Sequence, residues 1–190
     1  RQQGVIRNSQ YNRLNLTGTS TAQVTSWLNA DLVMQYMYDN NDQPYKGDGG
    51  PLLGLLVWPD TNNAKDYLTP AGTRNKLTSL AGEIDNPYFS INKNKNNAKN
   101  NRVNVNLGLT LSPVSFGNLK TNIGTDAYTS QYTIVRSPES ALANSVNGIL
   151  DQADDIQRNL NAQTVFNFNP VAIPKLKGFS ISGLVGNQVT

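Results

Sequence analysis

The sequence predicts an all-β protein: an antiparallel, up-and-down segment of a transmembrane β-barrel with about six strands. Two observations carry this prediction. Six stretches alternate between apolar and polar residues, which is the period of a strand with one apolar and one polar face. The connections between these stretches are alternately short and long, as in barrels with short periplasmic turns and long extracellular loops. A soluble β-sheet has the same strand period and stays open as an alternative.

The clearest alternation lies in a hairpin predicted between residues 101 and 132. Its first strand places aliphatic side chains on one face, namely Val103, Val105, Leu107, Leu109 and Leu111. The other face carries one cation and small polar groups, namely Arg102, Asn104, Asn106, Gly108 and Thr110. After a break around Pro113, the second strand repeats this division of faces. In a barrel the aliphatic face meets lipid and the polar face meets the lumen.

The six strands are predicted near residues 11–19, 27–39, 101–111, 118–132, 158–169 and 178–189. The two long loops are predicted at residues 40–100 and 133–157. In the second loop, apolar residues recur at helical spacing after Ser137-Pro138-Glu139, which predicts a short helix between residues 139 and 157. The first loop contains glycine-rich turns and an apolar segment at residues 51–59.

Aromatic residues gather at both ends of the predicted strands. The cluster near the short turns contains Trp27, Phe116, Phe166, Phe168 and Phe179. The cluster near the long loops contains Tyr11, Tyr36, Tyr38, Tyr128 and Tyr132. Transmembrane barrels carry aromatic girdles at both interfaces, because an amphipathic ring is most stable where hydrocarbon meets water. The clusters therefore favour a barrel over a soluble sheet.

The composition argues against several classes of function. The chain has no Cys and no His, so it offers no disulfide, no cysteine nucleophile and no His-based catalysis or zinc site. The Lys- and Asn-rich run at residues 92–102 contains no aromatic residue, which argues against nucleic-acid binding. The carboxylate pair Asp154-Asp155 falls in a predicted loop rather than in a catalytic motif, so no enzyme activity and no cofactor is expected. Asp39, Asp42 and Asp48 lack the EF-hand spacing and indicate turns rather than a metal site.

Six strands are too few for a closed transmembrane barrel, which usually has at least about eight strands. The first and last residues also lie within polar or strand-like sequence with no leader pattern. The sequence is therefore expected to be a partial barrel, residues 1–190, without a plug domain.

Several motifs resemble the barrel of SusC/RagA-type TonB-dependent transporters. They are Asp85-Asn86-Pro87-Tyr88-Phe89, the Asn- and Lys-rich stretch that leads to Arg102, and Ile123-Gly124-Thr125-Asp126-Ala127-Tyr128. Gly4-Val5-Ile6-Arg7-Asn8-Ser9, Thr25-Ser26-Trp27-Leu28 and Lys65-Asp66-Tyr67 fit the same order. The resemblance implies a multi-pass barrel of about 22 strands with a plugged lumen, in a Gram-negative, Bacteroidota-like outer membrane.

The resemblance also implies a function and partners. Such transporters import oligosaccharides or peptides and work with a SusD-like surface lipoprotein. They draw energy from the TonB complex through an N-terminal region that this sequence does not include, and their outer wall contacts outer-membrane lipid. The alternative function is a soluble β-sheet module that binds glycans through its aromatic loop.

The resemblance places the first long loop outside the cell, near the substrate cavity. Candidate substrate-binding residues there are Trp58, Asp60, Asp66, Tyr67, Tyr88 and Phe89. Their rings suit stacking on sugar faces and their carboxylates suit hydrogen bonds from hydroxyl groups. The alternative is that Trp58 joins the apolar residues at 52–57 in a small core that keeps the loop folded.

A second set of candidates lies on the predicted lumen face of the strands: Asp31, Arg102, Asn104, Asn106, Asn122, Asp126 and Asn161. These side chains either contact the plug and line the solute path or simply keep the interior wet.

Overall fold

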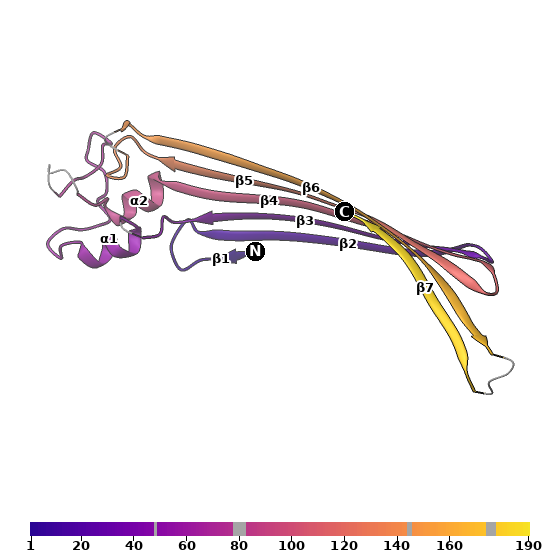
Figure 1. Ribbon diagram of the computed structural model, residues 1–190. Helices are drawn as coiled ribbons and strands as arrows, with labels where there is room; N and C mark the ends of the chain where they lie inside the picture. The colour runs from indigo at the N-terminus through magenta and orange to yellow at the C-terminus, as the bar shows by residue number, and fades with distance from the viewer. Residues whose placement is uncertain (48, 78–82, 144–145, 174–177) are drawn as a thin grey trace. The chain divides into compact units, whose positions relative to one another are not determined.

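The computed structural model describes residues 1–47, 49–77, 83–143, 146–173 and 178–190. These residues form one seven-stranded antiparallel sheet in which the strand order follows the sequence (Figure 1). The strands are β1 (Gln2–Gln3), β2 (Gln10–Thr25), β3 (Leu28–Gln43), β4 (Lys95–Val114), β5 (Gly117–Arg136), β6 (Ile149–Ala172) and β7 (Ser180–Val189). The predicted all-β, antiparallel, up-and-down architecture is confirmed. Within the described residues the sheet is open, with β1 and β7 as its edge strands.

The connections follow the alternation that the sequence predicts. Two-residue turns join β2 to β3 and β4 to β5, and longer segments join β3 to β4 and β5 to β6. Backbone bonds continue into the turns: the carbonyl of Trp27 accepts from the Ser112 amide at 2.7 Å, and that of Phe116 from the Asn169 amide at 2.8 Å. These bonds give backbone groups in the turns the hydrogen-bond partners that they need.

The strands are longer than predicted, and the helix predicted between residues 139 and 157 is wrong from residue 147 onward; residues 144 and 145 of that range lie outside the described residues. The β5–β6 connection covers only residues 137–148, because residues 149–157 belong to β6 rather than to a helix. Asn147 and Gly148 have positive φ angles of 56° and 98°, which end any helical path and turn the chain into the strand. Backbone pairing in the sheet then outweighs the weak helical spacing of the apolar residues.

The helices lie instead in the β3–β4 connection (Figure 1). They are α1 (Pro51–Val57) and α2 (Pro87–Lys93), and they pack against each other. Each begins with proline, whose fixed φ suits the first helical turn. The side-chain oxygen of Asn86 caps α2 by accepting from the Tyr88 amide at 2.8 Å and the Phe89 amide at 3.3 Å. No helix in the described part of the chain is both long and apolar enough to span a membrane.

The chain divides into two compact units. The loop unit contains Arg1–Arg13, Asp39–Asn100 and Ser130–Asp155, and therefore both helices and the long connections. The strand unit contains Leu14–Tyr38, Asn101–Thr129 and Ile156–Thr190, and therefore the short turns. Among the described residues, the buried apolar side chains are Phe89, Ala143, Pro51 and Pro87, and all belong to the loop unit.

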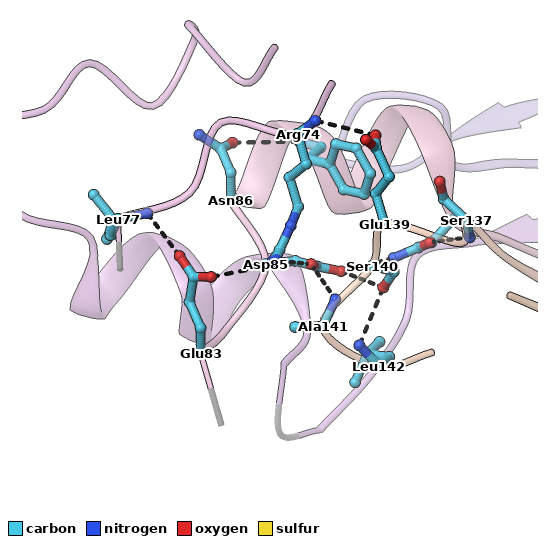
Figure 2. A network of polar contacts seen from close by, with 12 residues as sticks. Arg74, Leu77, Glu83, Asp85, Asn86, Ser137, Glu139, Ser140, Ala141 and Leu142 are labelled. Carbon is cyan, nitrogen blue, oxygen red and sulfur yellow. Dashed lines mark hydrogen bonds and ion pairs between the residues drawn. The ribbon is translucent and has the colours of Figure 1, made fainter. Parts of the chain in front are cut away.

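A buried polar network holds the loop unit together (Figure 2). The carboxylate of Asp85 lies at its centre, and Oδ1 accepts from Arg74 Nη1 at 2.7 Å and from the Ala141 amide at 2.7 Å. Its Oδ2 accepts from Asn94 Nδ2 at 3.1 Å and from the Ser140 hydroxyl. The side chains of Arg74 and Asp85 are only 2% and 0% exposed. A buried charge is stable only when it is fully paired and hydrogen-bonded, and Asp85 meets that condition.

Arg74 extends the network to three other parts of the loop unit. Its Nη2 atom lies 3.2 Å from Glu83 Oε2, and Glu83 Oε1 accepts from the Leu77 amide at 2.6 Å. The Arg74 backbone amide donates to Glu139 Oε2 at 3.0 Å. The network thus ties the β3–β4 connection to the β5–β6 connection, which are otherwise far apart in sequence (Figure 2).

We expect Asp85→Asn to lower the free energy of opening of the loop unit by roughly 3–5 kcal/mol, as for a buried ion pair that loses one partner. Both oxygens of the Asp85 carboxylate accept hydrogen bonds. The NH₂ group of the asparagine would replace one of them in either orientation and would face donors that it cannot accept from. Hydrogen exchange of the α2 amides, in the natural polypeptide that carries this sequence, measures the change. Asp66→Asn is the control: Asp66 is exposed in the same loop, so exchange should change by less than about 0.5 kcal/mol. Equal protection in both variants would show that the network does not hold the unit together.

Candidate functional site

The strand unit has two exposed faces and no apolar core. One face presents aliphatic side chains to the surroundings; examples with their exposed fractions are Leu16 (56%), Ile123 (45%), Leu160 (67%) and Val185 (67%). Among the described residues of this unit, no apolar side chain is buried. A face of this kind is far more apolar than single exposed residues on a soluble surface and marks a contact with lipid or with another molecule.

The opposite face of the strand unit is polar. Arg102 and Asp126 form a bidentate ion pair across β4 and β5, with Nε–Oδ1 and Nη2–Oδ2 distances of 2.8 and 2.6 Å. Both side chains are partly exposed, so solvent screens the pair and its main effect is to fix the two groups in place. Asn104 shares this face because it lies two residues from Arg102 on the same strand.

Amide side chains continue the polar face across β4, β5, β6 and β7. Asn106, Asn122, Asn161, Gln163 and Gln188 line one hollow. Glycines let these amides lie flat against the sheet: a Cβ at Gly108 would come within 3.0 Å of Asn122 Oδ1 and 3.6 Å of Asp31 Cβ, and one at Gly124 would collide with the Asn161 amide. All seven residues expected on the lumen face therefore share one face of the sheet.

The aromatic residues at the short-turn end lie where the sequence places them. Trp27, Phe116, Phe168 and Phe179 are exposed, and Phe166 packs edge-on against Phe168 with a centroid distance of 4.7 Å. A Cβ at Gly117 would collide with the Phe166 ring, so this glycine makes room for the aromatic side chain.

The aromatic girdle expected at the long-loop end is only partly correct. Tyr36 and Tyr38 share a face of β3 with Met34, and the Tyr36 hydroxyl donates to Asn101 Oδ1 at 3.2 Å. Tyr128 lies two residues from Asp126 and Tyr132 two residues from Ser130, which bonds Asn100. Alternation therefore puts Tyr128 and Tyr132 on the polar face, because in a strand only every second residue shares a face.

Tyr11 lies on the polar face as well. Its neighbour Gln10 donates to Asp42 on the opposite face, and adjacent residues of a strand point to opposite faces. A position near the end of a strand does not determine which side of the sheet a side chain faces. Three of the five tyrosines therefore lie on the polar face rather than in a girdle on the apolar face.

Four of the predicted substrate-binding residues lie together in the loop unit, between α1 and Arg74. Trp58 ends α1 and donates its indole N–H to the Asn62 carbonyl at 3.0 Å, while Asp60 is exposed. Asp66 accepts from Asn63 Nδ2 at 3.1 Å, and Tyr67 is half-buried beside it. This segment presents aromatic edges and free carboxylate oxygens in one short stretch.

Phe89 is wrongly assigned as a substrate contact. It lies on α2 with 0% exposure and forms the apolar core of the loop unit, whereas its neighbour Tyr88 is half-buried. The expected small core around α1 is also wrong, because its apolar residues are exposed: Leu52 (64%), Leu53 (40%), Leu55 (56%), Leu56 (83%) and Val57 (55%). In α1 only Pro51 and Gly54 are buried, and a Cβ at Gly54 would lie 3.3 Å from the Asp85 carbonyl.

The sequence interpretation missed the buried network of Arg74, Glu83, Asp85, Asn94 and Ser140. The Asp-Asn-Pro motif was a signal, since Asn before Pro is a strong helix cap. The partners of Asp85 lie up to 56 residues away, which no local pattern reveals.

Acidic residues in the loop unit serve as hydrogen-bond acceptors. Asp39 accepts from Asn100 at 2.8 Å, and Asp42 accepts from Gln10 and Asn97. Asp48 lies outside the described residues. In the part of the chain that the structure describes, no three His, Cys, Asp or Glu side chains are grouped as metal ligands.

Comparison with known proteins supports the fold. No protein-family model and no curated protein sequence matches the chain. Solved structures do: a chain of the RagAB peptide importer in the "closed-closed" state matches with a TM-score of 0.66 and 15% identity. The RagAB peptide transporter matches with 0.60 and 16%, and the importer in the "open-open" state with 0.55 and 15%.

Each match covers 95% of this chain and 20% of the other, so this chain spans about a fifth of the length of the chains it matches. At this level of identity the similarity establishes the fold. The fold is the one that the SusC/RagA resemblance predicts.

We expect Phe89→Ala to lower the free energy of opening of the loop unit by about 3–5 kcal/mol, because it empties the core of that unit. Hydrogen exchange of residues 85–94 reports the change. Leu56→Ala is the matched control, since this side chain is 83% exposed on α1 and its loss should leave exchange nearly unchanged. Equal exchange in both variants would contradict the assignment of Phe89 to the core of the loop unit.

Proposed function

We propose that this chain is part of the wall and outer loops of a SusC/RagA-type, TonB-dependent outer-membrane importer. The observation that carries the proposal is the strand unit with one exposed apolar face, one polar face and no covering layer among the described residues. In water, leaving apolar surface exposed costs a free energy of roughly 25 cal/mol per Å² relative to burying it. Contact with hydrocarbon removes this cost. Lipid on one side and water on the other match both faces.

The solute proposed for the importer is an oligosaccharide or a peptide. The polar face is rich in amides, which donate and accept hydrogen bonds with hydroxyl and peptide groups alike. We assign Asp31, Arg102, Asn104, Asn106, Asn122, Asp126 and Asn161 to the solute-facing lumen. Trp58, Asp60, Asp66, Tyr67 and Tyr88 remain candidates for solute contacts in the loop unit, and Phe89 is withdrawn.

The partners proposed are a SusD-like surface lipoprotein and the TonB complex. The support is the fold that this chain shares with chains of RagAB, which is described as a peptide importer. The neighbours are described as transporters, and accordingly no catalytic step is proposed for this chain. The soluble glycan-binding alternative would need a second layer over the apolar face, and none is formed by the described residues.

Cysteine labelling tests the two faces directly, because the sequence has no native Cys. In the natural polypeptide, inserted in outer membranes and free of other cysteines, Asn106→Cys and Asn122→Cys should react with a water-soluble maleimide. Leu107→Cys and Ile123→Cys, their neighbours on the apolar face, should react at least about tenfold more slowly, because lipid excludes the reagent.

Orientation is read from the same reagent on intact cells. Asn62→Cys in the loop unit should be labelled from outside, and Ser115→Cys in the β4–β5 turn only after the outer membrane is permeabilised. Equal labelling of both faces, or a folded monodisperse protein in buffer without detergent, would overturn the membrane proposal. Loss of peptide or oligosaccharide uptake on deletion of the gene would then test import.

A further inference from the structure

Side chains on the apolar face change in character along β3 and β4 toward the loop unit. On β3 the order is Met34, Tyr36, Tyr38, Asn40 and Asp42. On β4 it is Val103, Asn101, Lys99, Asn97 and Lys95. Residues two apart share a face of a strand, so each series runs along one side of the sheet. Aliphatic, then aromatic, then amide and cationic groups is the order of hydrocarbon, interface and lipid headgroups.

Hydrogen bonds show that the polar ends of these series share one face. Asp42 Oδ1 accepts from Asn97 Nδ2 at 2.7 Å, and Asp42 Oδ2 accepts from Gln10 Nε2 at 2.9 Å. Asn97 also donates to Asn40 Oδ1 at 2.6 Å. Three neighbouring strands, β2, β3 and β4, therefore contribute to one polar surface in the loop unit. Both oxygens of Asp42 accept hydrogen bonds from neutral amides, so this carboxylate keeps its negative charge within the polar surface.

The same surface carries three cations beside the single carboxylate of Asp42. Arg7, Lys95 and Lys99 are exposed, and within the described residues the ion pairs formed involve Arg74 and Arg102 instead. A cavity of about 820 Å³ adjoins the surface, lined by Arg1, Arg7 and Lys95 together with the amides of Asn8, Asn92 and Asn97. Asp42 is the one acidic residue in its described lining.

We propose that this surface, the headgroup site (Arg7, Lys95, Lys99 and Asn97), binds the phosphate groups of a phosphorylated glycolipid in the outer leaflet. The inference rests on the proposed function, because only an inserted sheet holds these residues at headgroup depth. Lysine and arginine donate charge-assisted hydrogen bonds to phosphate oxygens, and neighbouring amides bind the hydroxyls of the attached sugars. Lipid bound here anchors the loop end of β4 at the membrane surface.

Native mass spectrometry of the natural polypeptide in detergent, titrated with diphosphoryl lipid A, tests the site. Lys95→Gln/Lys99→Gln keeps polar, slightly shorter side chains and removes two charges, so binding should weaken about 30-fold. Lys65→Gln/Lys120→Gln is the matched control; it also removes two charges, from the α1–Arg74 segment and from the polar face of β5, and should change binding less than about twofold. Dephosphorylated lipid A should bind the unaltered protein about as weakly as phosphorylated lipid binds the Lys95/Lys99 variant.

Three results would overturn the headgroup site. The control variant could lose as much affinity as the Lys95/Lys99 variant, which would mean that overall charge alone decides binding. Dephosphorylated lipid could bind as tightly as the phosphorylated form, which would assign binding to the acyl chains. Inorganic phosphate could displace the lipid, which would make this a site for free anions. Each result is compatible with the maleimide pattern of an inserted sheet, so the site can fail while the proposed function stands.

Discussion

The structure depends on one constraint: a single layer of strands must satisfy its backbone groups by pairing with neighbouring strands, and it leaves both of its faces exposed. In the strand unit no apolar side chain among the described residues is buried, so packing contributes little to its stability. The continuous strand order β1 to β7 pairs backbone groups between neighbours. In hydrocarbon an unpaired backbone group costs several kcal/mol, so this pairing is obligatory. The glycines at 108, 117 and 124 are the buried positions of that unit, and each admits a neighbouring side chain against the sheet.

The loop unit solves the opposite problem. It must fix long connections without a sizeable apolar core among its described residues. Asp85, with four donors, and Arg74, with two carboxylates, replace that core by a charged one. Asp85 is fully hydrogen-bonded, whereas the buried Nε atom of Arg74 has no hydrogen-bond partner among the described residues. A buried polar network defines one arrangement of the connections more strictly than apolar contacts would. The capped helix α2 adds Phe89 and links the network to β4 through Asn94.

These two solutions divide the proposed work of the protein. The polar side of the strand unit carries fixed amides and one ion pair, and these are the proposed solute contacts of the wall. In the loop unit, Asn75 donates to the Asp66 carbonyl next to Arg74 of the buried network, which supports the segment from Trp58 to Tyr67. The aliphatic residues of α1 are exposed and do not contribute to the core of the loop unit.

The sequence by itself determined the strand period, the division into two faces and the alternation of short and long connections. All are local properties, because side-chain direction along a strand follows from residue number alone. For the same reason the sequence predicted that the seven residues proposed for the lumen share one face of the sheet. Tertiary structure alone decided that residues 149–157 extend β6, that Phe89 is core, that α1 is exposed, and that Asp85 gathers donors from residues 74, 94, 140 and 141. Those outcomes depend on backbone pairing and on charges brought together from distant parts of the chain, and neither has a local pattern.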